Sequence, residues 1–283
     1  MREPIDLHTH SSVSDGTETP RELIAAAIEA GLGTIALTDH DTTAGWEDAF
    51  AAAAGTGLTV IPGMELSTRV GHASVHLLAY LIDPDDLDLR EETLRIREDR
   101  LSRAEKIVSR LAADFDISWT DVLTQVSDGA TVGRPHIADA LVARGAAMDR
   151  SAAFRDILHP RHGYFVPHYA PDPLHAIELV RNAGGVPVLA HPATRGIDAL
   201  VPREHLMQLV DAGLFGLELR HRENRPDGVA ILSGYAEEFG LVVTGSSDYH
   251  GAGKPNRLGE NTTERAVLER IVHEASGTMP FFG

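Results

Sequence analysis

The feature that most constrains the fold is a series of short apolar runs that alternate with helical patterns along much of the chain. The runs are rich in Val, Ile and Leu, which is typical of strands buried on both faces. Between them lie stretches such as residues 20–30, where Thr19 can cap a helix and Gly31 can end it. Strands that alternate with helices predict a parallel sheet, either doubly wound or closed as a barrel. The predicted strands lie near residues 5–8, 34–38, 58–66, 75–82, 186–190, 216–220 and 241–246.

The alternation is interrupted in the middle of the chain. A long charged helical stretch at residues 90–113 is followed by three shorter helical segments, with no convincing strand between them. We therefore predict a helical insertion or cap over residues 99–171. The remaining residues, 1–98 and 172–283, are predicted to form the barrel. A length of 283 residues suits one large α/β domain with an insertion of this size.

Composition and charge exclude several classes of function. The chain has no cysteine, which excludes disulfides, thiolate metal ligands and cysteine nucleophiles. Its 42 acidic and 25 basic residues give a net charge of −17, which disfavours binding to duplex nucleic acid. A small phosphorylated substrate is less affected, because divalent ions would reverse the sign of the charge inside a pocket. The sequence shows no signal peptide and no run of membrane-spanning length, so we expect a cytoplasmic protein without membrane contact.

Histidines and acidic residues stand where most of these strands end. His8 and His10 are two residues apart, so on an extended strand both side chains point to the same face. Asp248 and His250 repeat that spacing after the last long apolar run. Because strand ends in an α/β barrel converge on one face, these distant residues should meet there. Imidazoles and carboxylates gathered in this way bind transition metals, so the pattern predicts a multinuclear metal site.

Other members of the predicted site come from the loops and from the third strand. Glu65 closes that strand, and the two oxygens of its carboxylate can bridge two ions. The short linker at residues 67–74 suggests a hairpin, which would place His76 near Glu65. His72 competes for the same role, but it lies in the linker, and His76 is favoured. Asp15 follows the first strand on a turn and can bend back toward a neighbouring ion.

Several short motifs resemble those of the PHP family, named for polymerase and histidinol phosphatase. The resemblance covers nearly the whole chain in order and in spacing. It implies a distorted seven-stranded (β/α) barrel with a helical insertion that holds two or three divalent ions, with Mn favoured over Fe or Zn. The motifs are Asp6-Leu7-His8-Thr9-His10, Asp15-Gly16, Thr38-Asp39-His40-Asp41, Gly63-Met64-Glu65, Ala190-His191-Pro192 and Ser247-Asp248-Tyr249-His250. The metal ligands implied by the resemblance are His8, His10, Asp15, His40, Glu65, His76, His191, Asp248 and His250.

The segment Gly133-Arg134-Pro135-His136 lies within the predicted insertion. Its residues fit a helix start, but the planar fork of Arg134 also suits a phosphate, and His136 offers a second donor. The segment resembles one in the PHP branch that contains nucleoside 3′,5′-bisphosphate phosphatases and a short-RNA 5′-exonuclease. There the insertion carries phosphate-binding Arg and His, which implies phosphate contacts from Arg134 and His136. Lys254 and His221 are further candidates for this role.

These patterns together predict a metal-dependent phosphoesterase. Its expected substrate is small and phosphorylated, either a nucleoside 3′,5′-bisphosphate or the 5′ end of a short RNA. Metal-activated hydroxide would attack phosphorus, Arg134 would offset the developing charge, and His191 or His136 would protonate the leaving group. The alternatives are a phosphatase for histidinol phosphate or another small molecule, a non-catalytic PHP module, and an amidohydrolase that cleaves a C–N bond. The last is disfavoured because no lysine stands near a strand end where it could become a bridging carbamate.

Overall fold

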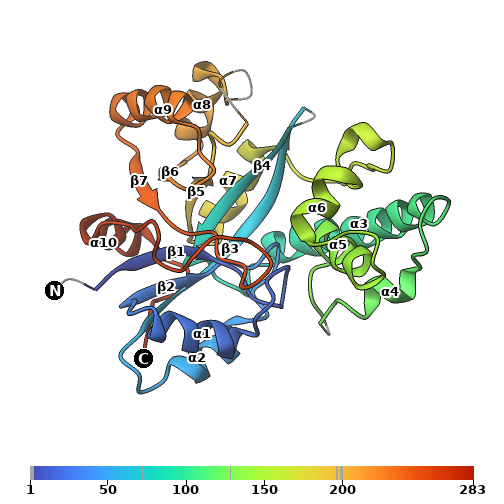
Figure 1. Ribbon diagram of the computed structural model, residues 1–283. Coiled ribbons are helices and arrows are strands. Elements are labelled where there is room, and N and C mark those ends of the chain that lie inside the picture. Colours follow the sequence, from blue (N-terminus) through green and yellow to red (C-terminus); the bar gives the residue numbers. More distant parts are fainter. Residues whose placement is uncertain (1–2, 72, 128, 196, 198–199) are drawn as a thin grey trace.

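The computed structural model describes residues 3–71, 73–127, 129–195, 197 and 200–283. Seven strands follow one another in chain order around a nearly closed barrel (Figure 1). The ring closes between the last of these strands and the first through a bridge between Thr9 and Tyr249, where the His10 amide donates to the Tyr249 carbonyl at 2.9 Å. The predicted seven-stranded α/β barrel is confirmed. The strands are β1 (Ile5–Thr9), β2 (Thr34–Leu37), β3 (Thr59–Val70), β4 (Ala73–Tyr80), β5 (Val186–Ala190), β6 (Gly216–Arg220) and β7 (Val242–Gly245).

One strand of the barrel runs against its neighbours. Strands β1 to β3 are parallel to one another, as are β5 to β7, but β4 is antiparallel to both β3 and β5. The predicted hairpin is therefore confirmed, and β4 is the exception to the parallel order that the alternation of strands and helices predicts. Only residues 71–72 separate β3 from β4, which is enough for a hairpin but not for a crossover. The hairpin is tighter than the predicted linker, because β3 continues to Val70, which pairs with Ala73.

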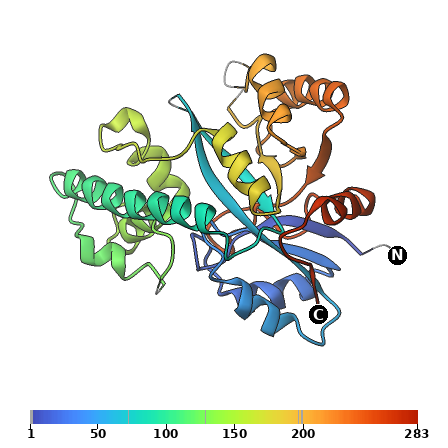
Figure 2. The same ribbon diagram turned by 180° about the vertical axis from the view of Figure 1, so that it is seen from behind.

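Helices cover the outside of the barrel (Figures 1 and 2), and their ends follow the predicted signals. At the start of α1, the Thr19 hydroxyl accepts from the Glu22 amide, and the Glu22 carboxylate accepts from the Thr19 amide at 2.8 Å. This capping box satisfies amides that a helix start leaves without partners. The outer helices are α1 (Pro20–Glu29), α2 (Trp46–Ala53), α7 (Pro173–Asn182), α8 (Arg203–Asp211), α9 (Pro226–Phe239) and α10 (Arg265–Glu274).

Apolar side chains fill the barrel and also surround it. Leu7 and Val188 are fully buried inside, where the Tyr80 hydroxyl donates to the Leu7 carbonyl at 2.9 Å. A larger apolar layer, which includes Leu23 and Leu37, lies between the strands and the outer helices. The strands are thus buried on both faces, which explains why they appear in the sequence as continuous apolar runs.

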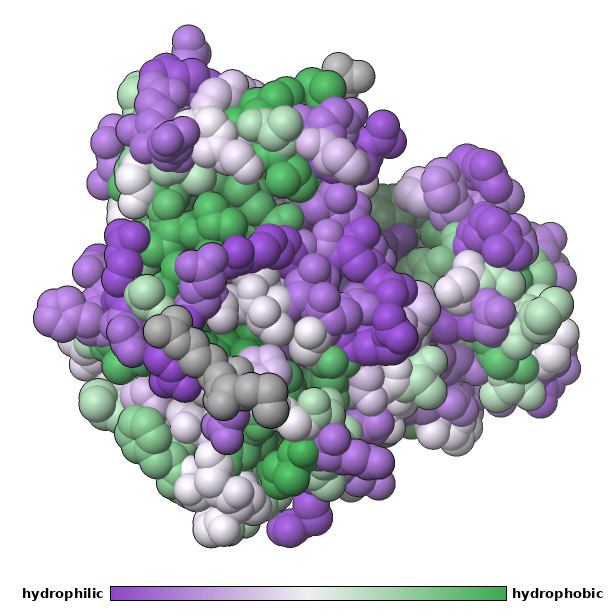
Figure 3. Space-filling model, turned by 60° about the vertical axis from the view of Figure 1, so that its left-hand side comes forward, coloured by the Kyte–Doolittle hydropathy of each residue, from purple (hydrophilic) through white to green (hydrophobic). Residues whose placement is uncertain are grey.

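The outer surface contrasts with this interior. Figure 3 shows a largely hydrophilic face, with apolar residues gathered in its upper half. Among the described residues, no helix combines the length and the apolar character needed to cross a membrane. A two-residue strand, β8 (Phe281–Phe282), pairs with the start of β3 and is too short for sequence periodicity to predict.

A second group of helices projects from one side of the barrel (Figures 1 and 2). Leu89 and Ile96 of α3 pack into the apolar layer of the barrel, whereas Leu111 of the same helix packs with Ile137 into a separate core. We call the part from the second half of α3 to η1 the cap. The division of the chain at residues 99 and 171 stays a prediction, and α3 passes through the first boundary unbroken. The helices of this group are α3 (Leu87–Leu111), α4 (Trp119–Leu123), α5 (Arg134–Ala143), α6 (Arg150–Asp156) and the 3-10 helix η1 (Pro160–His162).

Candidate metal centre

The predicted metal-ligand residues come together at one end of the barrel. Their imidazole nitrogens and carboxylate oxygens form four overlapping groups, and within each group the ligand atoms lie within 4.8 Å of one another. Each of the nine predicted residues belongs to at least one group. The groups are His8, His10, Glu65 and Asp248; His10, Asp15, His40 and His250; His40, Glu65 and His76; and His8, His191 and Glu218.

The first group brings buried acceptor atoms face to face. The Nε2 atoms of His8 and His10 are 3.0 Å apart, and Oε2 of Glu65 lies 3.2 and 3.0 Å from them. Oδ1 of Asp248 lies 3.5 and 3.4 Å from the same two nitrogens. Nδ1 of His8 lies 3.0 Å from Glu218, so in the neutral ring Nδ1 carries the hydrogen and Nε2 keeps a lone pair for a metal. Two imidazoles and two carboxylates gathered at these distances form a donor set that fits a divalent transition metal.

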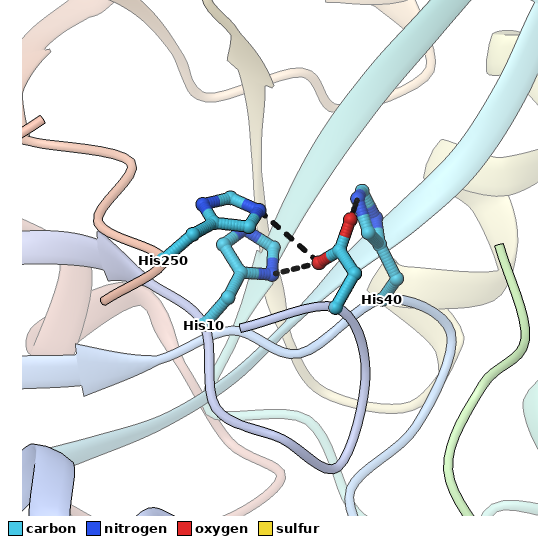
Figure 4. Close-up of side chains that lie close together, drawn as sticks. His10, His40 and His250 are labelled. Carbon is cyan, nitrogen blue, oxygen red and sulfur yellow. Dashed lines mark ion pairs between the residues drawn. The ribbon is translucent and has the colours of Figure 1, made fainter. Parts of the chain in front are cut away.

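The second group is built from the loops that follow β1, β2 and β7. Figure 4 shows His10, His40 and His250 converging from these three segments. Oδ1 of Asp15 is 3.1 Å from Nε2 of His250, and its Oδ2 is 3.7 Å from Nε2 of His40. Nδ1 of His40 and Nε2 of His250 are buried and make no hydrogen bond of acceptable geometry within the described residues. Buried imidazole nitrogens without a hydrogen-bond partner are typical of side chains that bind a metal ion.

Glu65 belongs to two of the four groups and lies beside histidines of the other two. Its Oε2 atom faces His8, His10 and His40, the last at 3.3 Å from Nδ1. Its Oε1 atom faces His76 at 2.7 Å and His191 at 3.1 Å. Its two oxygens thus face two different sets of imidazoles, so this carboxylate could contribute one oxygen to each of two ions.

The hairpin of β3 and β4 explains how His76 reaches this carboxylate. In that hairpin His76 lies opposite Ser67, two residues beyond Glu65 on the same face of β3. The competing residue, His72, lies outside the described residues.

Sequence reasoning missed Glu218, which lies inside β6 and is fully buried. Its Oε1 accepts from Nδ1 of His8 at 3.0 Å, and its Oε2 accepts from the His191 amide at 2.9 Å. A signal was present, since an acid within the apolar run Leu217-Glu218-Leu219 cannot be buried without partners. Because it stands within the strand rather than at its end, the strand-end pattern passed over it.

The groups of the centre shift the pKa values of one another. Burial lowers the pKa of His10, but Asp248 and Glu65 outweigh this effect and raise it to about 9. Burial raises the pKa of Glu65, but His40, His76 and His8 hold it well below its usual range. The metal-free centre therefore keeps its carboxylates charged and draws protons onto His8 and His10, whereas burial lowers the pKa of His40 and of His250. Divalent ions can take the place of those protons, which is the charge balance expected of a metal site.

Arg134 occupies the first position of α5 and is largely buried. Its guanidinium carbon lies 5.3 and 5.7 Å from the ring centroids of Phe154 and Phe165. Burial lowers its pKa, and so do the positive charges of Arg100 and Arg195. The neighbouring charges that act on Arg134 are therefore positive, as expected at a site that binds an anion.

Arg134 belongs to a larger group of cations between the barrel and the cap. Burial, together with the charges of Arg134, Arg100 and Arg69, lowers the pKa of Arg103 to about 9. Arg100 pairs with Asp41 at 2.9 Å, next to the predicted ligand His40. This accumulation of positive charge contrasts with the net charge of −17 for the whole chain. We call the group the arginine cluster, and its members are Arg69, Arg100, Arg103, Arg134 and Arg195.

The other predicted phosphate-binding residues lie on two sides of the centre. Nδ1 of His136 accepts from the Gly133 amide at 3.1 Å, so Nε2 carries its hydrogen. Nζ of Lys254 lies 2.6 Å from Oδ2 of Asp248, and Nε2 of His221 lies 3.6 Å from the same oxygen. Lys254 and His221 thus contact a predicted metal ligand, and their role as phosphate binders stays a prediction.

This chain is similar to known proteins over both the barrel and the cap. Residues 6–144 match the model of the PHP domain. Over 260 residues the chain is 33% identical to the 3′,5′-nucleoside bisphosphate phosphatase of Chromobacterium violaceum, and 89% of each chain is covered. It is 31% identical over 249 residues to the 5′-3′ exoribonuclease Rnm of Salmonella typhimurium, covering 87% of this chain and 84% of the relative. A crystal structure from Bifidobacterium adolescentis, described as a candidate metal-dependent phosphoesterase, has a TM-score of 0.94 at 42% identity with 98% of each chain covered.

Proposed function

This chain belongs to the PHP domain family, as its motifs predict, and we propose that it removes a phosphate from a nucleotide. The predicted class, a metal-dependent phosphoesterase of the nucleotide branch, is confirmed by its relatives. Our proposed substrates are a nucleoside 3′,5′-bisphosphate or the 5′ end of a short RNA, which are also the kinds of molecule that the relatives' names indicate. The same proposal includes a cytoplasmic location, where nucleotides and short RNA are turned over.

The observation that carries the proposal is the position of Glu65 among five imidazoles, at 2.7 to 3.3 Å from their nitrogens. We propose two or three divalent ions at this centre, with Mn favoured over Fe or Zn. When bound, the ions would supply a nucleophile from water at neutral pH and offset the charge of the phosphate. Their proposed ligands are His8, His10, Asp15, His40, Glu65, His76, His191, Asp248 and His250.

The arginine cluster gives the site its preference for a substrate rich in negative charge. A guanidinium can donate two parallel hydrogen bonds to one phosphate, and Arg134 projects this fork from the start of α5. Arg100 connects the cluster to the metal centre through Asp41, beside His40. A molecule with a second phosphate would therefore gain more here than histidinol phosphate, which has one. The arginine cluster therefore favours a nucleotide with two phosphates over histidinol phosphate.

The two histidines proposed as proton donors differ in their surroundings. Burial lowers the pKa of His136, in spite of the nearby charge of Asp15, so its ring is neutral at physiological pH. Since Nδ1 accepts from Gly133, the neutral ring presents an Nε2–H donor, which suits a phosphate oxygen better than it suits proton delivery. We therefore propose His136 as a hydrogen-bond donor to a phosphate oxygen. His191 is proposed to protonate the leaving alkoxide in a state in which its ring is not occupied by a metal ion.

A phosphate-release assay on the full chain with added Mn²⁺ tests the proposal. The panel consists of a nucleoside 3′,5′-bisphosphate, the matching 5′-monophosphate, a 5′-phosphorylated short RNA and histidinol phosphate. We expect the highest kcat/KM on the bisphosphate or the RNA, and loss of all release when a chelator is added. Release from histidinol phosphate alone would establish the alternative. No release from any substrate by the metal-loaded protein would favour a non-catalytic module.

A further inference from the structure

Two loops of the metal centre are joined to each other below the cap. The first loop is residues 11–17, which includes Asp15, and the second is residues 249–253, which includes His250. The Thr17 amide donates to the His250 carbonyl at 3.2 Å, and the Ala252 amide donates to the Thr17 hydroxyl at 2.8 Å. A shift of either loop therefore moves the other.

Arg150, at the start of α6 in the cap, reaches both loops. Its Nη1 donates to the Asp15 carbonyl at 3.0 Å. Its guanidinium also lies directly against Gly253. A Cβ at that position would clash with Nη1, so the contact depends on the missing side chain. The side chain of Arg150 is only 11% exposed, so these contacts are shielded from water.

A second residue of the cap, Asp139 on α5, holds this guanidinium in place. Its Oδ1 accepts from Nε of Arg150 at 2.8 Å, and its Oδ2 accepts from Nη2. Both carboxylate oxygens of Asp139 are used, so the positive charge of Arg150 is already balanced within the cap. Arg150 therefore meets Asp15 at its carbonyl and leaves the Asp15 carboxylate directed at His250, 3.1 Å away.

The cap holds the first loop at another point as well. The Thr131 amide donates to the Val13 carbonyl at 3.0 Å. From below, Asp39 accepts from the Ser11 amide at 2.8 Å and from the Ser14 hydroxyl at 2.6 Å. The loop thus lies between a fixed floor and the cap, and Arg150 is the contact nearest to Asp15.

We propose that Arg150, held by Asp139, is a positioning residue that couples the seating of the cap to the geometry of Asp15 and His250 in the metal centre. It would act through the backbone of the first loop and through the face of Gly253, without touching an ion. The cap would then do more than cover a substrate, because its position would set how tightly the second group of ligands binds its ion. This inference rests on the proposed metal centre, but it does not depend on which phosphate ester is hydrolysed.

The experiment compares Arg150→Met, Arg150→Lys and Asp139→Asn with the full-length protein. Each protein is stripped with a chelator, and its Mn²⁺ content is measured by elemental analysis during titration without substrate. Loss of a group that orients a metal ligand typically costs about 10–100-fold in affinity, and we expect that loss for Arg150→Met. Arg150→Lys should recover only part of it, because an ammonium cannot bind both oxygens of Asp139 and the Asp15 carbonyl at once. At saturating Mn²⁺, kcat should return most of the way to the wild-type value.

Arg144→Met is the matched control. Arg144 pairs with Asp116 inside the cap, so this variant also loses a salt-bridged arginine but leaves the loops untouched. We expect a wild-type Mn²⁺ affinity for it. A purely structural role for Arg150 predicts a lower Tm with unchanged Mn²⁺ affinity in Arg150→Met and Asp139→Asn, and that result would overturn the proposal. If Arg150→Met does not fold, the nearly isosteric Asp139→Asn decides the question. A wild-type protein that binds Mn²⁺ but hydrolyses no nucleotide would refute the proposed function and leave this test intact.

Discussion

Replacing Glu218 with Gln should weaken the metal centre without removing any of its proposed ligands. The carboxylate accepts from two donors, Nδ1 of His8 through Oε1 and the His191 amide through Oε2. Gln has the same shape but only one acceptor oxygen, so its amide nitrogen must face one of these donors. A buried donor left without a partner costs about 1–3 kcal/mol. Loss of a group that orients a metal-binding histidine lowers metal affinity by about 10–100-fold, or about 1.4–2.7 kcal/mol, so the two scales agree.

The assay is a Mn²⁺ titration of chelator-stripped protein, followed by bound metal and by phosphate release. We expect the half-saturating Mn²⁺ concentration of Glu218→Gln to rise roughly 10–100-fold. Glu92→Gln is the matched control, because Glu92 is also buried but accepts from the Tyr169 hydroxyl at 2.6 Å, a single bond that an amide oxygen can keep. Its half-saturating concentration should equal that of the wild type.

Two results would contradict this reasoning about Glu218. An unchanged Mn²⁺ affinity in a folded Glu218→Gln variant would mean that the hydrogen bond to His8 does not orient the imidazole. Loss of a full equivalent of metal even at saturating Mn²⁺ would mean that Glu218 binds an ion itself and does not only orient His8.

Three further outcomes are expected. Arg134→Ala should lower kcat/KM on a nucleoside bisphosphate roughly 10²-fold with unchanged metal content, and Arg134→Lys should restore only part of the loss. Unchanged kinetics in Arg134→Ala would mean that Arg134 only packs against Phe154 and Phe165. Asp248→Ala and His10→Ala should each retain less than about a tenth of wild-type turnover while remaining folded by circular dichroism, and higher activity in either variant would remove that residue from the ligand set. Protein purified without chelator should contain more than one equivalent of transition metal by elemental analysis. Its Tm should fall when a chelator is added, because the ions bind the native state. A folded protein with no metal and no response to Mn²⁺ would contradict the proposed metal centre.

The sequence was most informative where function and local pattern coincide. A two-residue spacing after an apolar run identifies two pairs of candidate ligands, His8 with His10 and Asp248 with His250. Because strand ends converge in a barrel, the two pairs are predicted to meet. The antiparallel direction of β4 follows from the predicted hairpin, because two parallel strands cannot be joined by so few residues.

Contacts between distant segments could not be predicted in this way. The arginine cluster joins Arg69 of β3 to Arg134 of α5, and neither residue has a local pattern that indicates the other. The same holds for Arg150 and Asp15, which lie 135 residues apart and meet only because the cap folds against the barrel. Such pairs depend on how the cores of the barrel and the cap pack against each other. The periodicity of apolar residues predicts which residues lie inside each core, but not how the two cores meet.

The continuity of α3 has a mechanical consequence. Its 25 residues form one rod about 37 Å long, with one end in the core of the barrel and the other in the core of the cap. A helix of this kind bends sharply only where its hydrogen-bond ladder is broken, so it supports the cap as a beam rather than as a hinge. The cap is then held at one place against the loop that carries Asp15, which Arg150 contacts at 3.0 Å. A ligand of the metal centre would meet this side of the site as a fixed wall rather than as a moving lid.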